Sequence, residues 1–459
     1  MASTLFGVQG VVVVEVDVEA DGGLTVWLAT DPRLPPACPD CAVVSDRVHE
    51  YVLTRPRDLP RPAGGAAVGV APVAVVWAKR RWRCGNPDCP RATFTESVPQ
   101  IPPGARLIER VREHVAQLIG EAGMPVCTAA AQVGVSWPSA HQALIDRVDP
   151  VPDTRPGPVE ALGIDETRRG RPRFTRDPDT SRSVVLADRW HTGFVDLAGG
   201  QGLLGQVEGR TADDAAYWLH QAGPAWRAQV RVVVIDMSTI YASAVRRMLP
   251  HARLAVDPFQ VVQLATKMVG DVRRRVVREK YGRRGRSGDA EYGVKNLLLR
   301  NREHLTPDQF DKILSTLDGD AAGQQILLAW IAKEKLRDLI RLRERICGTH
   351  PTPERIRHHL HEFFTWCATY DHIPELTSLA QTIDRWRDPI TTAIELGVSN
   401  AKSEGLNRVI KLEGRKAYGF RNTTNQRRRL RYATTRTSRP PTTTKPRPRT
   451  VITRQHDPG

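Results

Sequence analysis

The sequence predicts a multidomain α/β protein, in which a small β-rich domain and a helix-turn-helix precede a mixed α/β core that is interrupted by an all-α insertion. Three observations carry this prediction. Two cysteine pairs lie in strand-like sequence, the apolar pattern becomes helical near residue 107, and β-branched runs then alternate with helices. A length of 459 residues fits two to four domains.

Charge gives the main indication of a partner. Lys and Arg number 67 against 51 Asp and Glu, a formal net charge of +16. Such an excess indicates a polyanion, with nucleic acid as the leading candidate. Hydrophobic residues make up 40% of the chain, and no run approaches the roughly 18 apolar residues of a membrane span. We therefore expect neither a membrane protein nor a disordered one.

The N-terminus and the cysteine count indicate a cytoplasmic protein. The first nine residues lack a basic start, and the apolar run Val11–Val14 is too short for a signal peptide. Seven cysteines in a chain of this length do not make a disulfide scaffold, and an odd number fits a reducing compartment.

Residues 1–103 are expected to form the β-rich domain. A hairpin is predicted over residues 10–28, around the turn signal Asp21-Gly22-Gly23. Two more strand-like runs follow at 51–59 and 68–83, separated by the turn-prone segment Pro62–Gly65.

The cysteines of this domain suit a metal. Cys38 and Cys41 form a Cys-x2-Cys pair, and Cys84 and Cys89 form a Cys-x4-Cys pair. Four thiolates from two tight turns match the tetrahedral coordination of Zn²⁺, and a site closed by four protein ligands is structural. The alternative is two unrelated surface pairs. The other cysteines are expected to be buried apolar residues; they are Cys127, Cys347 and Cys367.

Residues 104–148 are expected to form the helix-turn-helix. The alanine-rich stretch 128–136 turns through Gly134, and Ser136 is placed to cap a second helix. In such motifs the second helix enters the major groove of DNA. The alternative is an ordinary helical hairpin. The expected DNA contacts are Ser136, Trp137, Ser139, His141 and Gln142.

A linker at 149–158 is expected to lead into the core. The first part of the core spans 159–282, the all-α insertion 283–390, and the last part of the core 391–431. Strands are predicted at 161–164, 183–187, 192–196, 230–235 and 254–256, and helices at 211–220, 258–279 and 399–412.

The end of the chain is basic. From Arg421 to Arg454 it contains 11 Lys or Arg and no acid. Such a composition buries too little surface to fold, so a disordered basic arm is expected, with the tail proper at 432–459.

Three carboxylates are candidates for chemistry. Asp165 and Asp236 are predicted to end buried strands, and Glu404 lies in a predicted helix. Carboxylates held in this way are suited to a pair of hard cations with open water positions, and two such metals support phosphodiester displacement. A single strand-end Asp is more often a cap. The same position is predicted for Asp188, Asp196 and Asp257, so the pattern alone leaves the choice open.

Several motifs together carry a family resemblance. They are Cys38-Pro-Asp-Cys41, Cys84-Gly-Asn-Pro-Asp-Cys-Pro90, Gly163-Ile-Asp-Glu166, Val234-Ile-Asp-Met237 with Tyr241, Val256-Asp-Pro-Phe259, and, most specifically, Ser399-Asn-Ala-Lys-Ser-Glu-Gly-Leu-Asn407. With them the chain resembles the ISL-three family of bacterial insertion-sequence transposases over roughly residues 35–432. These are DDE enzymes with an RNase H-like core.

The resemblance implies a function and a site. Asp165, Asp236 and Glu404 would be the catalytic triad, binding Mg²⁺ or Mn²⁺ for cleavage at the element ends and transfer of the strand into target DNA. Double-stranded DNA would be the partner, bound by a homodimer in the bacterial cytoplasm at the nucleoid, and Zn²⁺ would be structural. The alternative function is a DNA-binding regulator, a domesticated transposase without catalysis.

The resemblance and the charge together also suggest further DNA contacts, although such basic side chains often only solvate a surface. The expected contacts are Lys402, Asn407, Lys411, Arg415, Arg427, Arg428, Arg429 and Arg431. One departure is visible, because Pro258 and Gln260 stand where the family usually has Arg and His.

Overall fold

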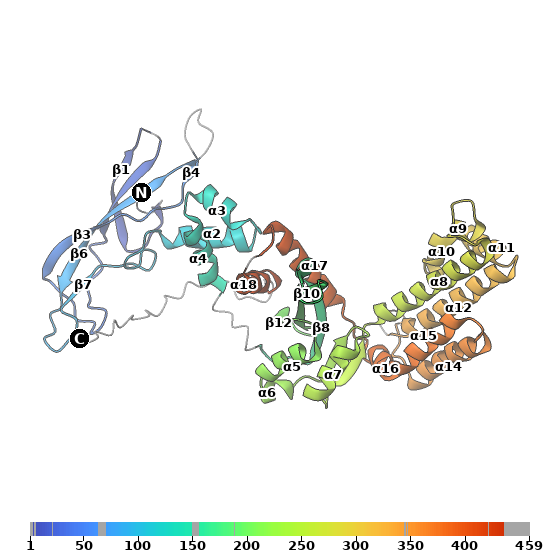
Figure 1. Ribbon diagram of the computed structural model, residues 1–459. Coiled ribbons are helices and arrows are strands. Elements are labelled where there is room, and N and C mark those ends of the chain that lie inside the picture. The colour runs from blue at the N-terminus through green and yellow to red at the C-terminus, as the bar shows by residue number, and fades with distance from the viewer. Residues whose placement is uncertain are drawn as a thin grey trace. The chain divides into compact units, whose positions relative to one another are not determined.

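The computed structural model describes residues 3, 6–20, 22–62, 70–148, 156–187, 189–343, 346, 348–420 and 422–435. The chain forms two compact units, one of Met1–Val151 with Leu412–Gly459 and one of Pro152–Lys411 (Figure 1). Asp21, Cys347, Asp188, most of the predicted turn at 62–65, most of the predicted linker and the tail beyond residue 435 lie outside the described residues.

The first unit begins with a five-stranded sheet in the order β1-β2-β6-β3, with β7 paired to β6. Its strands are β1 (Val11–Val18), β2 (Leu24–Thr30), β3 (Val48–Thr54), β6 (Val73–Arg83) and β7 (Thr93–Thr95). The predicted hairpin is confirmed as β1 and β2. Two further short strands pair with each other, β4 (Arg61–Pro62) and β5 (Val70–Ala71).

Three helices follow the sheet, α2 (Glu109–Gly120), α3 (Val126–Val133) and α4 (Trp137–Val148). They confirm the helices expected here. α3 ends at Gly134, whose φ of 71° lies in the left-handed region that glycine adopts without strain. The apolar faces of the three helices pack together through Val111, Val115 and Leu144.

A fourth helix of this unit corrects the expected disorder. α18 (Thr423–Thr434) begins at Asn422, whose side chain accepts a hydrogen bond from the Asn425 N–H, and it packs on α4 and α2. The basic composition predicted disorder here, but the charge of Arg429 is compensated by Glu413 of the preceding helix. Gly120 makes the contact possible, since a Cβ there would lie 2.1 Å from the ring of Tyr432.

The second unit contains a five-stranded mixed sheet in the order β12-β11-β8-β13-β14. The strands are β8 (Ala161–Arg168), β11 (Trp190–Asp196), β12 (Leu203–Glu208), β13 (Val232–Ile235) and β14 (Arg253–Val256). β11 is antiparallel to both β8 and β12, whereas β13 runs parallel to both β8 and β14. The mixed α/β core is thereby confirmed, although β12 was not predicted.

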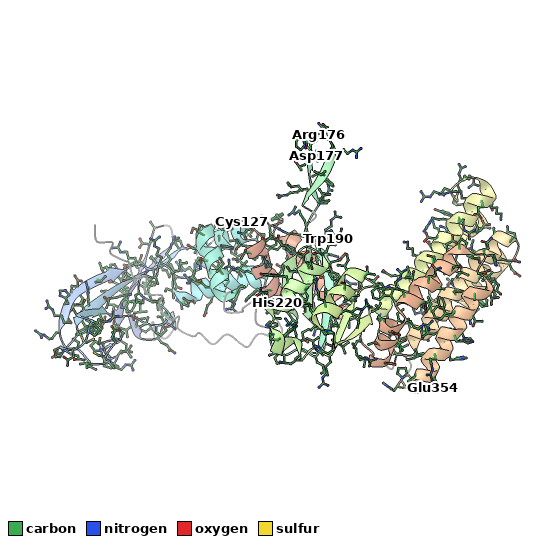
Figure 2. The ribbon with its side chains drawn as sticks, turned by 60° about the horizontal axis from the view of Figure 1, so that its bottom comes forward. Cys127, Arg176, Asp177, Trp190, His220 and Glu354 are labelled. Atoms are coloured by element: carbon green, nitrogen blue, oxygen red, sulfur yellow. The ribbon has the colours of Figure 1, made fainter. Side chains whose placement is uncertain are left out.

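Two strand predictions need correction. The run 183–187 is a strand, β10 (Ser183–Ala187), but it pairs with β9 (Arg173–Arg176) in a separate ribbon and not in the core sheet. Figure 2 shows this ribbon projecting from the unit, with Arg176 and Asp177 near its tip. Asp165 does not end its strand either, because β8 continues to Arg168 through polar residues.

Helices surround and extend this sheet. Those beside it are α5 (Ala212–Gln221), α6 (Pro224–Arg227), α7 (Thr239–Met248) and α8 (Pro258–Tyr281). Every element described between 283 and 390 is helical: α9 (Ala290–Gly293), α10 (Lys295–Leu298), η1 (Arg302–His304), α11 (Pro307–Leu317), α12 (Ala321–Arg341), α14 (Pro353–Thr369), α15 (Pro374–Arg385) and the first residues of α16 (Arg387–Leu396). No helix in the described ranges is long and apolar enough to cross a membrane.

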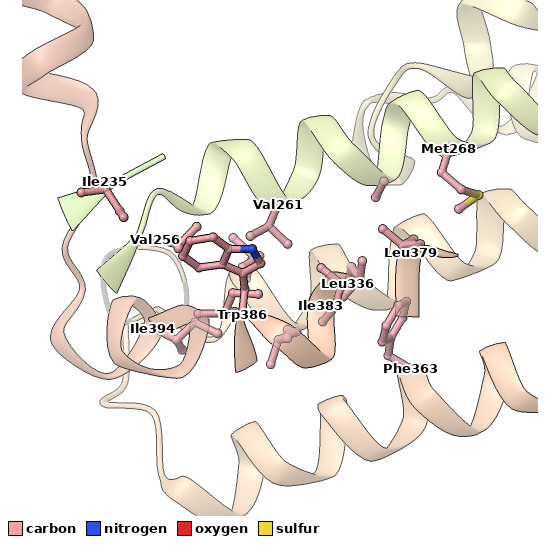
Figure 3. Packing of buried hydrophobic residues seen from close by; sticks show 14 of the residues in the cluster. Ile235, Val256, Val261, Met268, Leu336, Phe363, Leu379, Ile383, Trp386 and Ile394 are labelled. Atoms are coloured by element: carbon pink, nitrogen blue, oxygen red, sulfur yellow. The ribbon is translucent and has the colours of Figure 1, made fainter. Parts of the chain in front are cut away.

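One hydrophobic core joins the sheet to these helices. Val261 and Met268 of α8 lie beside Leu336 of α12 and Leu379 of α15, and Trp386 closes the row next to Val256 of the sheet (Figure 3). Because burial of a large apolar side chain contributes roughly 1.5–3 kcal/mol, this shared core fixes α8 against the sheet. The position of α8 matters below, because it begins at the carboxylate site.

Candidate catalytic and metal sites

A glycine in the central strand allows a helix to lie over Asp165. A Cβ at Gly163 would be 2.5 Å from Ser403 Oγ and 2.9 Å from Asn400 Oδ1, so only glycine permits this approach. The approaching helix is α17 (Ala401–Lys416), which carries Glu404 in its first turn. The negative charge of Glu404 is favoured there by the helix dipole.

Asp165 is held by hydrogen bonds on both oxygens. Its Oδ1 accepts the N–H of Glu166 at 2.7 Å, and its Oδ2 accepts Asn407 Nδ2 at 2.6 Å. Asn407 is fixed in turn, because its Oδ1 accepts Thr167 Oγ1 at 2.6 Å. The structure thus places Asn407, which was predicted as a DNA contact, directly on the candidate catalytic carboxylate.

Asp236 follows β13 as predicted, and the parallel pairing of β13 with β8 brings it to the same end of the sheet. Its Oδ2 accepts a hydrogen bond from Gln260 Nε2 at 3.0 Å. Gln260 lies in the first turn of α8, which Asp257 caps. The departure from the family pattern at Gln260 therefore still supplies a donor to Asp236.

Burial and neighbouring negative charge raise the pKa of both aspartates. Burial, then the charge of Asp236, raises the pKa of Asp165 to about 7, with smaller contributions from Glu166 and Glu404. Burial, then the charges of Asp257 and Glu404, raises the pKa of Asp236 to about 6. The three predicted carboxylates are thus close enough to interact, and their uncompensated negative charge suits a hard cation.

The carboxylates are gathered less tightly than the cysteines. Among the described residues, only Cys38, Cys41, Cys84 and Cys89 form a group of three or more metal-ligand side chains whose donor atoms all lie within 4.8 Å of one another. The oxygens of Asp165 and Asp236 already accept the hydrogen bonds given above, and remaining lone pairs can coordinate a metal. The donor set therefore fits Mg²⁺ or Mn²⁺.

Sequence reasoning gave no role to the back of this site. Tyr241 donates its hydroxyl hydrogen to Glu166 Oε2 at 3.0 Å, and its oxygen lies 3.0 Å from Thr192 Oγ1. Burial raises the pKa of Tyr241 above its ordinary value, so the phenol stays protonated. A signal was available for Asn407, which follows Glu404 by three residues and so shares its helix face.

The four cysteines have the geometry of a zinc site. The Sγ atoms of Cys38 and Cys89 lie 3.9 Å apart, and those of Cys41 and Cys84 lie 3.6 Å apart. Zn–S bonds of 2.3 Å in a tetrahedron give an S···S separation of about 3.8 Å. Burial raises the pKa of the Cys38 thiol, but N–H groups of Asp40 and Cys41 outweigh it and lower the pKa to about 7.

The remaining cysteines behave differently from one another. Cys367 is buried as predicted, and burial raises the pKa of its thiol to about 12. Cys127 is exposed, which corrects the expectation that it is a core residue. The inward face of α3 is formed by Ala129, Ala130 and Val133, and Cys127 lies outside it. Figure 2 labels Cys127 on the outside of its helix.

The predicted recognition residues lie together at the start of α4. Trp137 is 50% exposed, and its ring stacks on His141 at a centroid separation of 4.8 Å. The Ser139 N–H donates to Ser136 Oγ at 3.4 Å, as expected of a cap. Gln142 is exposed and donates to Asp146 Oδ1 at 2.7 Å. Burial, and then the charge of Arg428, lowers the pKa of His141.

The basic residues fall into two groups. Lys411 and Arg415 are exposed on α17, Arg427 and Arg428 are half-buried, and Lys402 donates to the carbonyl of Gly199. Arg429 and Arg431 are buried instead. Arg429 Nε donates to Glu413 Oε2 at 3.0 Å, and its Nη2 donates to the carbonyls of Gly123 and Met124, each at 3.1 Å.

The fold and the site define a class, and comparison with known proteins agrees. Residues 162–430 match the model of a transposase family, the DDE family ISL3 (ISL-three). The match covers more than half of the chain, and the chain therefore belongs to this family of transposases.

Two named relatives lie within the same class. The transposase for insertion sequence element IS1001 of Bordetella parapertussis is 25% identical over 434 residues, 92% of this chain and 94% of that protein. The transposase for insertion sequence element IS1557 of Mycobacterium tuberculosis is 28% identical over 254 residues, 51% of this chain and 54% of that protein. The Drosophila P element transposase strand transfer complex overlaps with a TM-score of 0.37 at 11% identity, over 71% of this chain and 92% of that one.

Proposed function

We propose that this transposase cleaves DNA at the ends of its insertion sequence and joins the freed ends to target DNA, with Asp165, Asp236 and Glu404 as the catalytic carboxylates. The observation that carries the proposal is that Asp165 and Asp236 lie half-buried at one end of the sheet, where burial and nearby acids, Glu404 among them, raise the pKa of each. Catalytic sites are where such perturbed pairs gather. The sheet order β12-β11-β8-β13-β14 supports an RNase H-like core, since it runs third, second, first, fourth, fifth.

The residues of the site have separate proposed roles in binding metal and in positioning the carboxylates. Asp165 and Asp236 would hold the divalent metals, and Glu404 would complete the site. Bound Mg²⁺ or Mn²⁺ supplies an activated water and charge stabilisation for phosphodiester displacement. Asn407 and Gln260 each donate to one catalytic Asp and so orient its remaining lone pairs. Buried Tyr241 holds Glu166 on the opposite face of β8.

The first unit would supply the DNA contacts and a structural zinc. Zn²⁺ held by Cys38, Cys41, Cys84 and Cys89 would tie the two cysteine turns together. The exposed start of α4, with Trp137 stacked on His141, would read the terminal repeats in the major groove. We further propose that two copies act together on double-stranded DNA, because an element has two ends.

The arginines of α18 have different proposed roles. Lys411, Arg415, Arg427 and Arg428 remain proposed DNA contacts, as does Lys402 where a bound strand reaches α17, whereas the hydrogen bond from Asn407 to Asp165 supports a positioning role for Asn407. The burial of Arg429 and Arg431 supports a structural role in the free protein. Arg429 joins α18 to α17 and to the turn after α2, so its loss would leave Glu413 buried without its partner.

The substitution Asp236→Asn tests the proposal. We expect loss of Mg²⁺-dependent strand cleavage by about 10³-fold or more, with DNA binding retained, because metal binding needs the carboxylate charge. The matched control is Asp388→Asn at an exposed position of α16, which should cleave normally. Binding without Mg²⁺-dependent cuts by the unmodified protein would favour the regulator instead. Unchanged cleavage by Asp236→Asn would remove Asp236 from the site.

A further inference from the structure

A large cavity in the second unit opens beside the carboxylate site. Its volume is about 1300 Å³, and its lining includes Glu404 and Asp257 at one end. The lining then follows α8 away from the sheet, opposite residues from the end of α12 and from α15. Small-molecule pockets measure roughly 300–1,000 Å³, so this cavity is larger than a metabolite requires.

The residues of α8 that line the cavity include a mainly polar row along the helix, beside the apolar Val262 and Leu264. Its residues follow at spacings of three and four, which places them on one side of the helix. They are Gln260, Gln263, Lys267, Gly270 and Arg274. The opposite face carries the buried residues that form the shared core. The polar face therefore leads from Asp236, through Gln260, for about 21 Å into the helical region.

The charge of the cavity suits a polyanion. Six cationic side chains line it against three carboxylates, those of Asp257, Glu303 and Glu404. Glu303 neutralises Arg337 and Arg341, and Arg274 pairs with Asp271. Lys267 and Arg385 both line the cavity and are exposed, and neither pairs with a carboxylate in the ranges that the structure describes. Exposed cations on a cavity wall are available to phosphates.

Two further features favour one strand over a duplex. Gly270 lies in the middle of α8, where glycine costs about 1 kcal/mol relative to alanine, and only the flexible end of Arg274 lies against the helix backbone there. Phe259 is 52% exposed at the catalytic end of the cavity, beside Gln260. Cations along a groove with an exposed aromatic ring are the usual arrangement for binding single-stranded nucleic acid.

We infer that this cleft holds one DNA strand along α8, leading away from the reacting phosphate, through contacts of Lys267 and Arg385 with the strand's phosphates and close approach at Gly270. The inference rests on the proposed DNA chemistry of the same site. It adds that the helical region binds part of the substrate and does not serve only as a scaffold. The contacts are to the backbone, so they carry no sequence preference.

The test measures binding of a mixed-sequence single strand of about 20 nucleotides to the full chain in the Asp236→Asn background, which prevents cutting. We expect the double variant Lys267→Ala/Arg385→Ala to weaken binding about tenfold at about 0.1 M salt and to reduce the salt slope by about 1.4, the value for two lost contacts. Arg278→Ala is the matched control, because Arg278 is an exposed residue of α8 outside the cavity lining.

A variant that leaves the net charge unchanged tests whether the shape of the cavity, and not only its charge, contributes to single-strand binding. Gly270→Leu places bulk at the cavity wall, where the nearest neighbour is the flexible end of Arg274 at 3.3 Å. We expect it to melt normally and still to weaken single-strand binding. Hydrogen exchange should show protection of residues 263–274 when the strand is added.

Three results would overturn the inference. The double variant could bind the single strand as tightly as Arg278→Ala does, or it could lose as much affinity for duplex as for single strand, or more. Hydrogen exchange could also show no protection of α8 when the strand is added. The failure of the proposed function is a separate result, since it would appear as normal binding without Mg²⁺-dependent cleavage in the unmodified protein. If Lys267→Ala/Arg385→Ala binds single strands as tightly as Arg278→Ala, and the same pair of changes with Asp236 intact cleaves normally, only the cleft is rejected.

Discussion

Replacing Asp165 by Asn should stabilise the metal-free protein, although it removes a catalytic group. In the folded chain the pKa of Asp165 is raised from 3.8 to about 7, by burial and then by the charge of Asp236. Each pKa unit corresponds to about 1.4 kcal/mol, so the ionised carboxylate costs up to about 4 kcal/mol relative to the unfolded chain. Relaxation and water penetration reduce this value, and we expect about 2 kcal/mol.

The pH dependence follows from the sign of this shift. Between pH 3.8 and about 7 the folded state binds more protons at Asp165 than the unfolded state does, so stability falls as pH rises through this window. The stabilising contribution of the protonated group is complete below the lower value and lost above the higher one. Asp165→Asn removes this dependence, and its single side-chain oxygen can still accept from Asn407, although the hydrogen bond from the Glu166 N–H is then lost.

Thermal unfolding with and without Mg²⁺ gives the assay. At pH 8 without Mg²⁺, and with zinc retained, the variant should melt about 4–8 °C higher than the parent, given about 2–4 °C per kcal/mol for a unit of this size. The difference should shrink towards pH 4, and Mg²⁺ should raise the melting temperature of the parent more than that of the variant. Asp388→Asn serves as the exposed control. An unchanged or lower melting temperature for Asp165→Asn at pH 8 would refute the electrostatic reasoning.

Four further predictions follow from individual contacts. Cys41→Ser should lower bound zinc from one ion per chain and destabilise the first unit by several kcal/mol, as measured by metal analysis and melting. Asn407→Leu should slow cleavage about 10–100-fold while DNA affinity in a filter-binding assay stays within twofold, whereas a pure DNA contact would show the reverse. Gly120→Ala should destabilise the protein by about 1–3 kcal/mol in a urea titration, because the new Cβ meets the Tyr432 ring; no change would show that α18 does not pack there. Trp137→Ala should weaken binding to element-end duplex by about 1–3 kcal/mol in fluorescence anisotropy but leave binding to unrelated duplex unchanged.

Much of the candidate site could be predicted because its chemistry sits in local patterns. Asp236 directly follows a β-branched run, and the cysteines stand in two short turns. The pattern of strands did not decide which of several strand-end acids is catalytic. The strand before Asp165 was also predicted too short, so Asp165 was placed at its end and not within it. β8 continues through polar residues because the end of this strand lies at the carboxylate site, where its side chains do not pack against a second apolar layer.

Other features depend on contacts between distant residues. In the sequence Arg429 belongs to a basic tail. In the structure its side chain is buried and donates to the carboxylate of Glu413, 16 residues earlier, and to two carbonyls some 300 residues earlier. The strand at 183–187 was predicted to lie in the core sheet, because the composition of a strand does not specify which strand it pairs with. Asn407 was predicted as a DNA contact from the family resemblance, and its hydrogen bond to Asp165, 242 residues away, could not be predicted from the sequence.

A cleavage assay with the purified protein and a DNA fragment carrying its own gene with flanking sequence tests the proposed transposase activity. Strand cuts are mapped to single nucleotides with and without Mg²⁺, beside Asp236→Asn. We expect discrete Mg²⁺-dependent cuts at a pair of inverted ends, absent with the variant. Specific binding to those ends with no cuts under any divalent metal, or cuts that persist in Asp236→Asn, would contradict the proposal.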